Sequence, residues 1–494
     1  MSIQVEDFPF EVSKEGKPTY DTIFARSFSQ HEQQKLGYAA LVSCFIIVFS
    51  FFAIIQPHLL MSSLPILNPR PSRIPALPML VKEDTSISQQ MVMTKMSILK
   101  GVGERKVKQE IKPICNVLDP RSDSCEVKGE IRIHGNSSTI FSVSSQKDSL
   151  AGQGSWTIRP YPRKGDGIAM AHVRELSVKT LGGDEEAPHC TVNHNVPVIV
   201  FSIGGYAGNY FHDFTDVLIP LFVTSHQFNR EVQFLITDLR NYWIEKYHTV
   251  LKQLSRYDVI DNDRDHYNVH CFPHMIMGLK ASKEFSIDTS KSPNGYSMPD
   301  FRQFLKNTFS LKRATAIKFR DDHTDRKPRL LLISRKKSRS LANEDEVAEM
   351  ARSLGYEVVV DEAISEISKI ASLVNSFDVL MGVHGAGLTN LVFLPANAIV
   401  IQIVPLGLDF LAMKDFGKPS LDLNLRYLEY KIKEEESSLI QQYPRNHVVF
   451  PDSDTINELG WLHFKSIYLD KQDVKIDVGR FRDKLLEALE LLHG

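Results

Sequence analysis

Between residues 328 and 407 the sequence alternates apolar runs with helix-like segments, and this alternation restricts the fold more than any other feature of the chain. Four runs are rich in Val, Ile and Leu and have the length of buried strands: 328–335, 356–362, 378–387 and 398–407. Three segments between them have helical patterns: 343–355, 364–377 and 388–395. Strands that alternate with helices build parallel sheets, so this part is predicted to form a Rossmann-like α/β lobe.

The preceding part of the chain shows the same alternation less regularly. Short β-like runs occupy 126–200, and strands are then predicted at 195–205 and 231–239, with helices at 209–228 and 242–255. We therefore expect an α/β fold with two Rossmann-like lobes that face each other across a cleft, where ligands bind at the carboxyl ends of the strands. The amphipathic last helix, within 476–494, could cross back onto the first lobe.

One stretch near the N-terminus differs from the rest of the chain. Residues 36–55 contain no charged side chain, and at about 1.5 Å per residue this stretch spans about 30 Å, the thickness of one hydrocarbon core. A cleaved signal peptide is the less favoured alternative, because 35 mostly polar residues precede the stretch. Six prolines in 56–80 suit an extended stem. We predict a cytoplasmic tail at 1–35, a transmembrane signal-anchor helix at 36–55 and a stem at 56–110.

The cysteines and a glycosylation sequon indicate where the large part of the chain resides. Four of the five cysteines follow the predicted anchor, as does the only N-x-S/T sequon, at Asn136. Cys115 and Cys125 bracket a nine-residue polar loop and are predicted to form a disulfide, whereas Cys190 and Cys271 could be paired or free. Three basic residues flank the anchor before it and two after it, which favours a cytoplasmic tail. This layout predicts a single-pass type II glycoprotein of the Golgi membrane, with its large part in the lumen.

Charge balance and motif context argue against nucleic-acid and metal binding. The 58 Lys and Arg residues and the 60 Asp and Glu residues give a net charge of −2, without the basic surplus of nucleic-acid-binding proteins. The Asp-x-Asp sequences at 261–263 and 452–454 lie in polar, turn-like contexts. His266, His270 and His274 recur every four residues, but Pro273 would interrupt a helix that aligned them. No metal site is therefore expected.

The first candidate site lies on the helix predicted from Asn209. At about 100° per residue, Asn209, His212, Asp213 and Asp216 share one helix face, and apolar side chains occupy the other. The glycine-rich loop at 204–208 would let the backbone approach a ligand closely. The alternative is a solvated face whose acids interact with the helix dipole. An imidazole beside carboxylates suits acid–base chemistry, so His212, Asp216 and Asp213 are candidate catalytic residues and Asn209 is a candidate cleft residue.

Two segments of the second lobe are candidates for binding phosphate. The strand end at 334–339 is rich in Arg and Lys, and Arg can grip a diphosphate with two parallel hydrogen bonds; the alternative is a solvated basic loop. At 384–390 a strand ends in a glycine turn before a helix, and backbone N–H groups in such a turn bind phosphate. The candidate phosphate-binding residues are Arg335, Arg339, Asn343, His384, Gly385, Gly387, Thr389 and Asn390.

Three ordered motifs give the sequence a family resemblance. They are Asn209-x-x-His212-x-x-x-Asp216, Arg335-x-x-x-Arg339-x-x-x-Asn343-Glu344, and HGAGLTNLVFLP at 384–395. From Cys115 to its C-terminus the sequence resembles the plant members of glycosyltransferase family 61, and its anchor, stem and cysteine loop look like those of the clade that decorates xylan. The resemblance implies an inverting GT-B enzyme that uses a UDP-sugar, with an acceptor-side lobe at 111–325, a nucleotide-sugar lobe at 326–475 and a C-terminal helix at 476–494.

The resemblance also implies roles for the candidate residues. His212 is expected to be the base that removes a proton from the acceptor hydroxyl, with Asp216 as its partner; Asp216 as direct base is the reserve, and Asp213 follows. Arg335, Arg339 and the amides of 385–390 would stabilise the departing UDP, so no metal cofactor is required, although manganese is compatible with the sequence.

The expected activity is transfer of a pentosyl group from a UDP-pentose to the xylan backbone, with xylose slightly preferred to arabinofuranose. The alternatives are an N-glycan β-1,2-xylosyltransferase and an inactive UDP-binding member of a xylan-synthesising Golgi complex. The motifs do not identify the donor.

Overall fold

The computed structural model describes residues 115–135, 137–143, 155–181, 186–318, 326–363 and 366–493. They belong to one compact unit, Ile111–Gly494. The predicted tail, anchor and stem and the sequon residue Asn136 lie outside the described residues. Within the ranges that the structure describes, no helix combines the length and the hydropathy that a membrane crossing needs.

The C-terminal half, residues 326–493, is built on a five-stranded, entirely parallel sheet in the order β12-β11-β13-β14-β15. Its strands are β11 (Arg329–Ile333), β12 (Glu357–Asp361), β13 (Val379–Val383), β14 (Ile399–Val404) and β15 (Arg426–Lys431). The first four are the strands that the apolar runs predict, and β13 and β14 are buried along their whole length. The order is that of a doubly wound sheet, which places ligands at the carboxyl ends of its strands.

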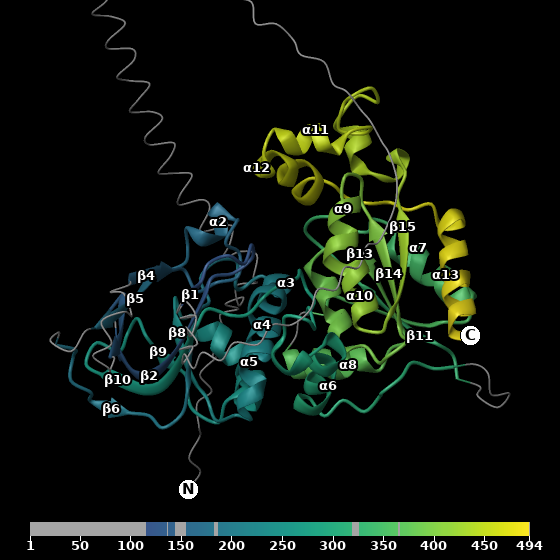
Figure 1. The fold of residues 1–494 in the computed structure, drawn as a ribbon. Helices are drawn as coiled ribbons and strands as arrows, with labels where there is room; N and C mark the ends of the chain where they lie inside the picture. Colours follow the sequence, from purple (N-terminus) through teal and green to yellow (C-terminus); the bar gives the residue numbers. More distant parts are fainter. Residues whose placement is uncertain are drawn as a thin grey trace, which may run out of the picture. The chain divides into compact units, whose positions relative to one another are not determined.

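Helices cover this sheet and extend beyond it. They are α7 (Glu344–Ser353), α8 (Ile367–Asn375), η4 (Ala386–Phe393), α9 (Asp409–Ala412), η5 (Met413–Gly417), α10 (Lys418–Asp422), η6 (Glu434–Glu436), η7 (Ser438–Gln441), α11 (Ser453–Glu458), α12 (Trp461–Phe464), η8 (Lys465–Asp470) and α13 (Val478–His493). The last helix, α13, packs against α7 and β15, and the Tyr356 hydroxyl donates to the carbonyl of Leu485 over 2.8 Å. The expectation that it crosses back onto the first half is therefore wrong (Figure 1).

The N-terminal half, residues 115–318, has a ten-stranded mixed sheet. Eight strands follow the order β4-β5-β3-β2-β10-β7-β8-β9, and in addition β1 pairs with β2 and β6 pairs with β10. Its strands are β1 (Cys115–Asn116), β2 (Ser124–His134), β3 (Thr139–Val143), β4 (Ser155–Ile158), β5 (Leu176–Leu181), β6 (Val192–Asn193), β7 (Val198–Ser202), β8 (Gln233–Thr237), β9 (Ile260–Asp261) and β10 (Val269–Met277). Only the part from β10 to β9 is a continuous parallel array, so this half departs from a purely Rossmann-like lobe.

Apart from α2, which precedes β5, the helices of this half follow strands of the parallel array. They are α2 (Gly167–Met170), α3 (Tyr210–His212), η1 (Asp213–Leu218), α4 (Ile219–Ser225), η2 (His226–Phe228), α5 (Asn241–Leu254), η3 (Pro293–Gly295) and α6 (Met298–Thr308). The four-residue spacing of the histidines has no helical meaning, because His270 and His274 lie in β10. Their rings pair with Asp265 and Glu126 respectively.

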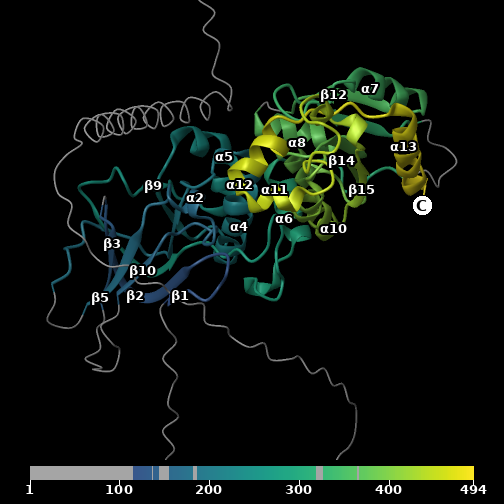
Figure 2. The same ribbon diagram turned by 90° about the horizontal axis from the view of Figure 1, so that it is seen from above.

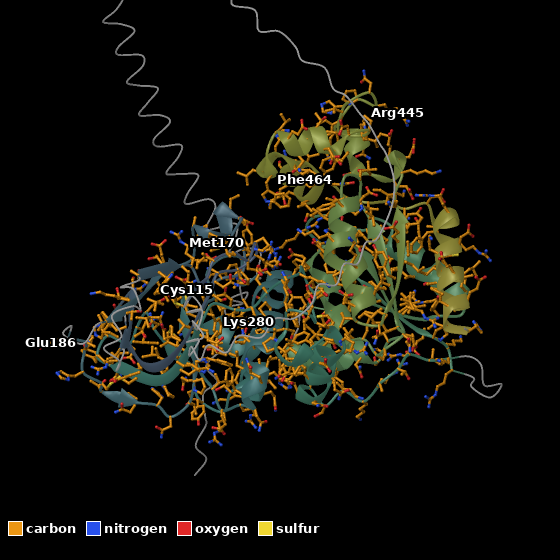
Figure 3. The ribbon with its side chains drawn as sticks, in the orientation of Figure 1. Cys115, Met170, Glu186, Lys280, Arg445 and Phe464 are labelled. Atoms are coloured by element: carbon orange, nitrogen blue, oxygen red, sulfur yellow. A yellow bond between two sulfur atoms is a disulfide. The ribbon has the colours of Figure 1, made fainter. Side chains whose placement is uncertain are left out.

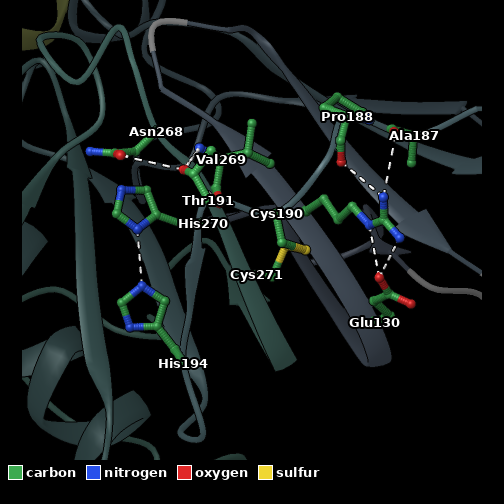
Figure 4. The surroundings of a disulfide bond; sticks show 11 residues. Glu130, Ala187, Pro188, Cys190, Thr191, His194, Asn268, Val269, His270 and Cys271 are labelled. Atoms are coloured by element: carbon green, nitrogen blue, oxygen red, sulfur yellow. Dashed lines mark hydrogen bonds and ion pairs between the residues drawn. A yellow bond between two sulfur atoms is a disulfide. The ribbon is translucent and has the colours of Figure 1, made fainter.

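Two disulfides stabilise the first sheet. Cys115 pairs with Cys125, as the loop between them predicts, and joins β1 to β2. Cys190 pairs with Cys271 of β10, which resolves the alternative that the sequence leaves open. Figure 4 shows this second bond beside a hydrogen bond of 2.9 Å between the rings of His194 and His270. Two disulfides are typical of a protein that folds in an oxidising compartment.

The two halves share one continuous hydrophobic core. Phe214 of η1 meets Phe393 of η4 edge to face, with ring centroids 6.1 Å apart, and the Tyr210 hydroxyl donates to Oδ1 of Asn390 over 2.9 Å. Helix α4 lies on the side of the first sheet that faces the second sheet in both views, and α3 does so in Figure 1 (Figures 1 and 2). Side chains from both halves fill this junction (Figure 3).

Candidate active site

A change of helix type places the first set of candidate residues. Helix α3 continues directly into the π-helical turn η1, so the rotation of about 100° per residue does not hold over 213–218. His212 and Asp216 are still neighbours, with His212 Nδ1 2.9 Å from Asp216 Oδ2. Asn209 lies at the exposed start of α3, where its side chain accepts a hydrogen bond from the Phe211 N–H over 3.0 Å.

The carboxylate of Asp216 is fully buried and held from several sides. The Tyr161 hydroxyl and Arg163 Nε each donate to Oδ2 over 2.8 Å, and Arg121 Nη2 lies 3.2 Å from Oδ1. Burial opposes ionisation of Asp216, but the attraction of His212 and Arg163 outweighs it and lowers the pKa of the carboxyl. Asp216 is therefore an ionised acceptor for the Nδ1–H of His212.

The second ring nitrogen of His212 has no hydrogen-bond partner in the described ranges. The side chain keeps 21% of its surface exposed, whereas that of Asp216 keeps 0%. A carboxylate that accepts from one nitrogen fixes the tautomer and makes the other nitrogen a proton acceptor. The arrangement can therefore remove a proton from a hydroxyl group placed at Nε2.

The structure separates Asp213 from this pair, although the sequence places all three on one face. Asp213 is fully buried and accepts hydrogen bonds from Trp243 Nε1 over 2.8 Å and from the Tyr247 hydroxyl over 2.6 Å. Its Oδ1 also accepts the Gly208 N–H over 2.6 Å, and Gly208 has a φ of 110°, which favours glycine. Asp213 thus ties the glycine loop to α5 and does not face the Nε2 of His212.

Behind His212 lies a cluster of two arginines and two carboxylates, here called the ionic cluster: Arg121, Arg163, Asp216 and Glu284. Each arginine bridges both acids, with Arg121 Nη1 2.8 Å and Arg163 Nη2 2.6 Å from Glu284. Burial opposes ionisation of Glu284, but the two arginines lower its pKa well below the ordinary value. Asp216 belongs to a predicted motif, but no local pattern in the sequence indicates that Arg163 and Glu284 join it, because they come from distant segments. Arg121 has a weak signal, since it lies inside the predicted disulfide loop.

On the other half, the glycine turn after β13 lies against two arginines. Gly385 has a φ of 151°, and a Cβ atom there would lie 2.5 Å from Arg335 Nη1 and 3.2 Å from Arg339 Nη1. Arg339 Nη1 donates to the carbonyl of His384 over 2.9 Å, while its Nε is buried without a partner among the described residues. Burial, followed by the charge of Arg335, lowers the pKa of Arg339 to about 9, so both arginines are cationic at neutral pH. A bound diphosphate would neutralise this pair.

His384 is a buried neutral ring beside these arginines. The Gln402 amide nitrogen lies 2.7 Å from Nδ1, and the Gln402 carbonyl oxygen accepts from the Tyr427 hydroxyl over 2.9 Å. Burial and the charges of Arg339 and Arg335 hold the pKa of His384 well below its ordinary value. A neutral ring that accepts at Nδ1 carries its proton on Nε2, so His384 can donate one hydrogen bond.

The remaining phosphate-binding candidates lie in the interior. The Asn343 amide does not cap α7; it donates to the carbonyl of Ile476 over 2.9 Å and accepts the N–H of the same residue. Asn390 bonds to Tyr210 and to the Gly387 carbonyl, and a Cβ atom at Gly387 would lie 2.9 Å from a methyl group of Ile333. Thr389 is buried, and its hydroxyl has no partner among the described residues. The structure thus gathers Arg335, Arg339, His384 and Gly385 around one turn, here called the arginine turn.

An aromatic contact connects the two sets of residues. The ring of Phe416, in η5, lies 5.4 Å from that of Phe211 and 5.5 Å from that of His384. Phe211 in turn contacts His212, with centroids 5.5 Å apart. The His212–Asp216 pair and the arginine turn therefore lie on the two sides of one aromatic contact.

The two Asp-x-Asp sequences have partners within the chain. Asp263 lies 2.7 Å from Arg174 Nη1 and accepts the Thr237 hydroxyl over 2.9 Å, while Asp452 caps α11 by accepting the N–H groups of Asp454 and Thr455. In the part of the chain that the structure describes, no group of three or more His, Cys, Asp or Glu residues is arranged to hold a metal ion.

Comparisons with known proteins place these features in a family. Residues 210–401 match the family model described as Glycosyltransferase 61. An alpha-1,3-arabinosyltransferase of Oryza sativa subsp. japonica is 48% identical over 400 residues, which cover 80% of this chain and 68% of that protein. A beta-1,2-xylosyltransferase of the same organism is 45% identical over 392 residues, covering 76% and 84% of the two chains. A xylan glycosyltransferase of Arabidopsis thaliana is 37% identical over 390 residues, covering 76% and 78%.

Proposed function

Because the chain belongs to glycosyltransferase family 61, as the motifs indicate, we propose that it transfers a pentosyl group from a UDP-pentose to xylan. The names of its relatives support this activity, since they include arabinosyltransferases, xylosyltransferases and a xylan glycosyltransferase. The arabinosyl- and xylosyltransferases resemble the chain to a similar degree, so both UDP-xylose and UDP-arabinofuranose are donors to test.

We infer a GT-B enzyme that inverts the configuration of the transferred sugar by a single displacement. The acceptor oxygen forms a bond to the anomeric carbon while the bond between that carbon and the UDP oxygen breaks. His212 Nε2 takes the proton of the acceptor hydroxyl, and Asp216 holds the ring and stabilises the imidazolium that results. The hydrogen bond between His212 and the fully buried Asp216 is the observation that carries this proposal.

The arginine turn would serve the leaving group. UDP departs with additional negative charge on its terminal phosphate, and preorganised donors at that position lower the barrier. Arg335, Arg339 and the backbone N–H groups after Gly385 supply cationic and polar contacts from one side. His384 can add the hydrogen bond from its Nε2. This donor set supports leaving-group stabilisation by the chain's own residues.

The test is a UDP-release assay on the purified full-length chain, with mass analysis of the product. UDP-xylose and UDP-arabinofuranose are offered with xylan oligosaccharides, and UDP-N-acetylglucosamine is the control donor. Pentose transfer to the oligosaccharide supports the proposal. Transfer only to an N-glycan acceptor would identify the N-glycan enzyme, and UDP binding without any transfer would identify the inactive member of a complex.

We also propose that the protein is a single-pass type II protein of the Golgi membrane, with residues 56–494 in the lumen. The uncharged stretch at 36–55 supports a membrane anchor. The two disulfides support a lumenal location for residues 115–271, because thiols stay reduced in the cytosol. Protease protection of tagged, sealed Golgi vesicles tests the orientation: exposure of a C-terminal tag to protease would contradict it.

A further inference from the structure

A tyrosine in the glycine loop packs directly against the proposed base. The ring centroids of Tyr206 and His212 lie 4.7 Å apart, and the planes of the two rings are tilted by 43°. Phe211 also contacts His212, with its ring at 78° to the imidazole. The imidazole therefore has two aromatic neighbours in addition to its hydrogen bond to Asp216.

Tyr206 is itself fixed through both its side chain and its backbone. Its hydroxyl donates to Oδ1 of Asp166 over 3.1 Å, and its N–H donates to the Tyr161 hydroxyl over 3.2 Å. The Tyr161 hydroxyl donates in turn to Oδ2 of Asp216, the oxygen that also accepts from His212. A closed circuit of contacts thus runs from the imidazole through Asp216 and Tyr161 to the backbone of Tyr206, and back through the Tyr206 ring.

A glycine lets this circuit close. Gly205 has a φ of 41°, and a Cβ atom there would lie 2.5 Å from Cε1 of Tyr161. The Tyr161 ring therefore occupies the space that a side chain at position 205 would need. The close approach that a glycine permits at this point of the loop is an approach to Tyr161.

We propose that Tyr206 is a positioning residue for the transfer reaction: its ring holds the imidazole of His212 so that Nε2 points at the acceptor hydroxyl. The inference rests on the proposed function, in which His212 is the base. The hydrogen bond to Asp216 fixes one nitrogen of the ring. The torsion that turns an imidazole about its Cβ–Cγ bond has broad minima, however, so one bond leaves the plane of the ring poorly defined. Packing against Tyr206 supplies the second constraint.

The hydroxyl of Tyr206 anchors the ring and takes no proton in the reaction. It donates to Asp166, whose side chain also accepts the N–H groups of Ile168 and Ala169 as the N-cap of α2. Burial, followed by the charge of Asp166, raises the pKa of Tyr206 to about 12, so the hydroxyl keeps its proton at neutral pH. Tyr206 therefore acts through His212, and its contribution should vanish when the imidazole is absent.

The experiment compares Tyr206→Leu and Tyr206→Phe with the wild type in the full-length protein, and Tyr257→Leu is the matched control. Tyr257 is also partly buried, and its hydroxyl also donates to a carboxylate, that of Glu231, over 2.9 Å. An arginine lies over each tyrosine ring, Arg256 at 5.4 Å and Arg163 at 5.9 Å from the centroid. The control thus reproduces the surroundings of Tyr206 without the histidine.

For Tyr206→Leu we expect kcat to fall about 10- to 100-fold, because a base displaced by about 1 Å loses its alignment with the acceptor. The KM for the UDP-pentose should stay unchanged, and Tyr206→Phe, which keeps the ring, should lose much less turnover. In the His212→Ala background, Tyr206→Leu should have no further effect, since residues that act as a unit are not additive. Tyr257→Leu should match the wild type.

Chemical labelling of His212 tests the packing without any turnover. Diethyl pyrocarbonate acylates a neutral imidazole nitrogen, and mass analysis of the peptide gives the rate at this one histidine. Tyr206→Leu should raise the labelling rate, because it uncovers the imidazole. Tyr206→Phe and Tyr257→Leu should leave the rate unchanged.

Unchanged kcat in Tyr206→Leu would overturn the inference, as would an equal fold-loss in the wild-type and His212→Ala backgrounds. So would an unchanged labelling rate at His212, and this measurement decides where His212→Ala turns over too slowly to measure. If Tyr206→Leu does not fold, Tyr206→Met takes its place, and failure of both to fold would make Tyr206 a structural residue and overturn the inference. If the wild type transfers no sugar, the proposed function fails instead, and labelling alone then tests whether Tyr206 holds His212.

Discussion

Nδ1 of His212 lies 2.9 Å from Oδ2 of Asp216, and the exposed surface of Asp216 is 0%. The carboxylate can orient the imidazole, but it cannot itself reach an acceptor hydroxyl. The sequence leaves two candidate bases open. The geometry favours His212 as the base that takes the proton and Asp216 as the residue that positions its ring.

The first prediction concerns turnover. We expect His212→Ala to lose about 10²- to 10⁴-fold in kcat, because general-base catalysis is removed. Asp216→Asn should also lose turnover, since an amide can donate to Nδ1 and stabilise the wrong tautomer. UDP affinity, measured by calorimetry, should be retained by both variants. Near-normal turnover in both would make this helix face structural, whereas loss in Asp216→Asn alone would make the carboxylate the base.

The second prediction concerns stability and pH. The pKa values of Asp216 and Glu284 are both lowered in the folded state, so their contribution to stability is present above the ordinary carboxyl pKa and is lost as the pH falls through the folded values. Glu284→Gln leaves two partly buried arginines with one carboxylate and should lower the free energy of unfolding by about 3–5 kcal/mol near neutral pH. The loss should shrink on acidification. Urea unfolding between pH 3 and 7 measures both effects.

The control for this prediction is Glu349→Gln on α7, where the glutamate side chain is 72% exposed and pairs with Arg352. Exposed pairs of this kind contribute about 0–1 kcal/mol. Equal stability of the Glu284 and Glu349 variants at pH 7 would show that the ionic cluster does not hold the fold together.

The third prediction concerns the arginine turn. An alanine at Gly385 would place its Cβ 2.5 Å from Arg335 Nη1 and displace the guanidinium. We expect Gly385→Ala and Arg335→Ala each to weaken UDP binding about 10-fold or more, the value of a lost charge-assisted contact. Gly460→Ala is the control, because Gly460 has a φ of 105° and no atom near its Cβ position. An alanine there introduces the same backbone strain but displaces no arginine. A dissociation constant for UDP that is unchanged in Arg335→Ala rules out a diphosphate contact there.

The fourth prediction separates the two disulfides. Removing Cys115–Cys125, with a sequence separation of 10, should cost about 2–3 kcal/mol, and removing Cys190–Cys271, with a separation of 81, about 4 kcal/mol. The shorter loop carries Arg121 of the ionic cluster, so the paired Cys115→Ser and Cys125→Ser variant should lose more activity per folded molecule despite the smaller loss of stability. The opposite ranking of activities would show that the loop does not support the site.

The fifth prediction tests the sequon. If the large part of the chain is lumenal, Asn136 carries a glycan, because it is the acceptor of an N-x-S/T sequence in an accessible compartment. Treatment of the membrane-bound protein with a peptide N-glycosidase should increase the mobility of the wild type to that of Asn136→Gln. Identical mobility of the wild type and the variant before treatment would mean that the site is unmodified.

The local pattern of the chain predicts the elements that are buried on both faces. The strands β11, β13 and β14 follow directly from apolar runs, because a strand covered on both sides must be apolar throughout. The strand β15 has no such apolar run and is not predicted, because Arg426, Glu429 and Lys431 interrupt its apolar residues at the edge of the sheet.

The site is less predictable than the strands. His212 and Asp216 lie together in the structure, as their spacing predicts, because side chains four residues apart meet in the observed helix. The grouping with Asp213 fails because it assumes α-helical rotation through a segment that is a π-helix. Glu284 is 121 residues from Arg163 and 163 residues from Arg121, and no local pattern reports contacts over such separations.

The loop between Cys115 and Cys125 holds Arg121 against Asp216 and Glu284, and its ends are joined only when both thiols are oxidised. Closure of the loop, and with it the placement of Arg121, therefore depends on thiol oxidation. A newly made chain in reducing surroundings would lack the covalent closure of the loop that holds this arginine against Asp216, the partner of His212. On the proposed function, a chain with both thiols reduced is expected to turn over its sugar donor more slowly than the oxidised chain.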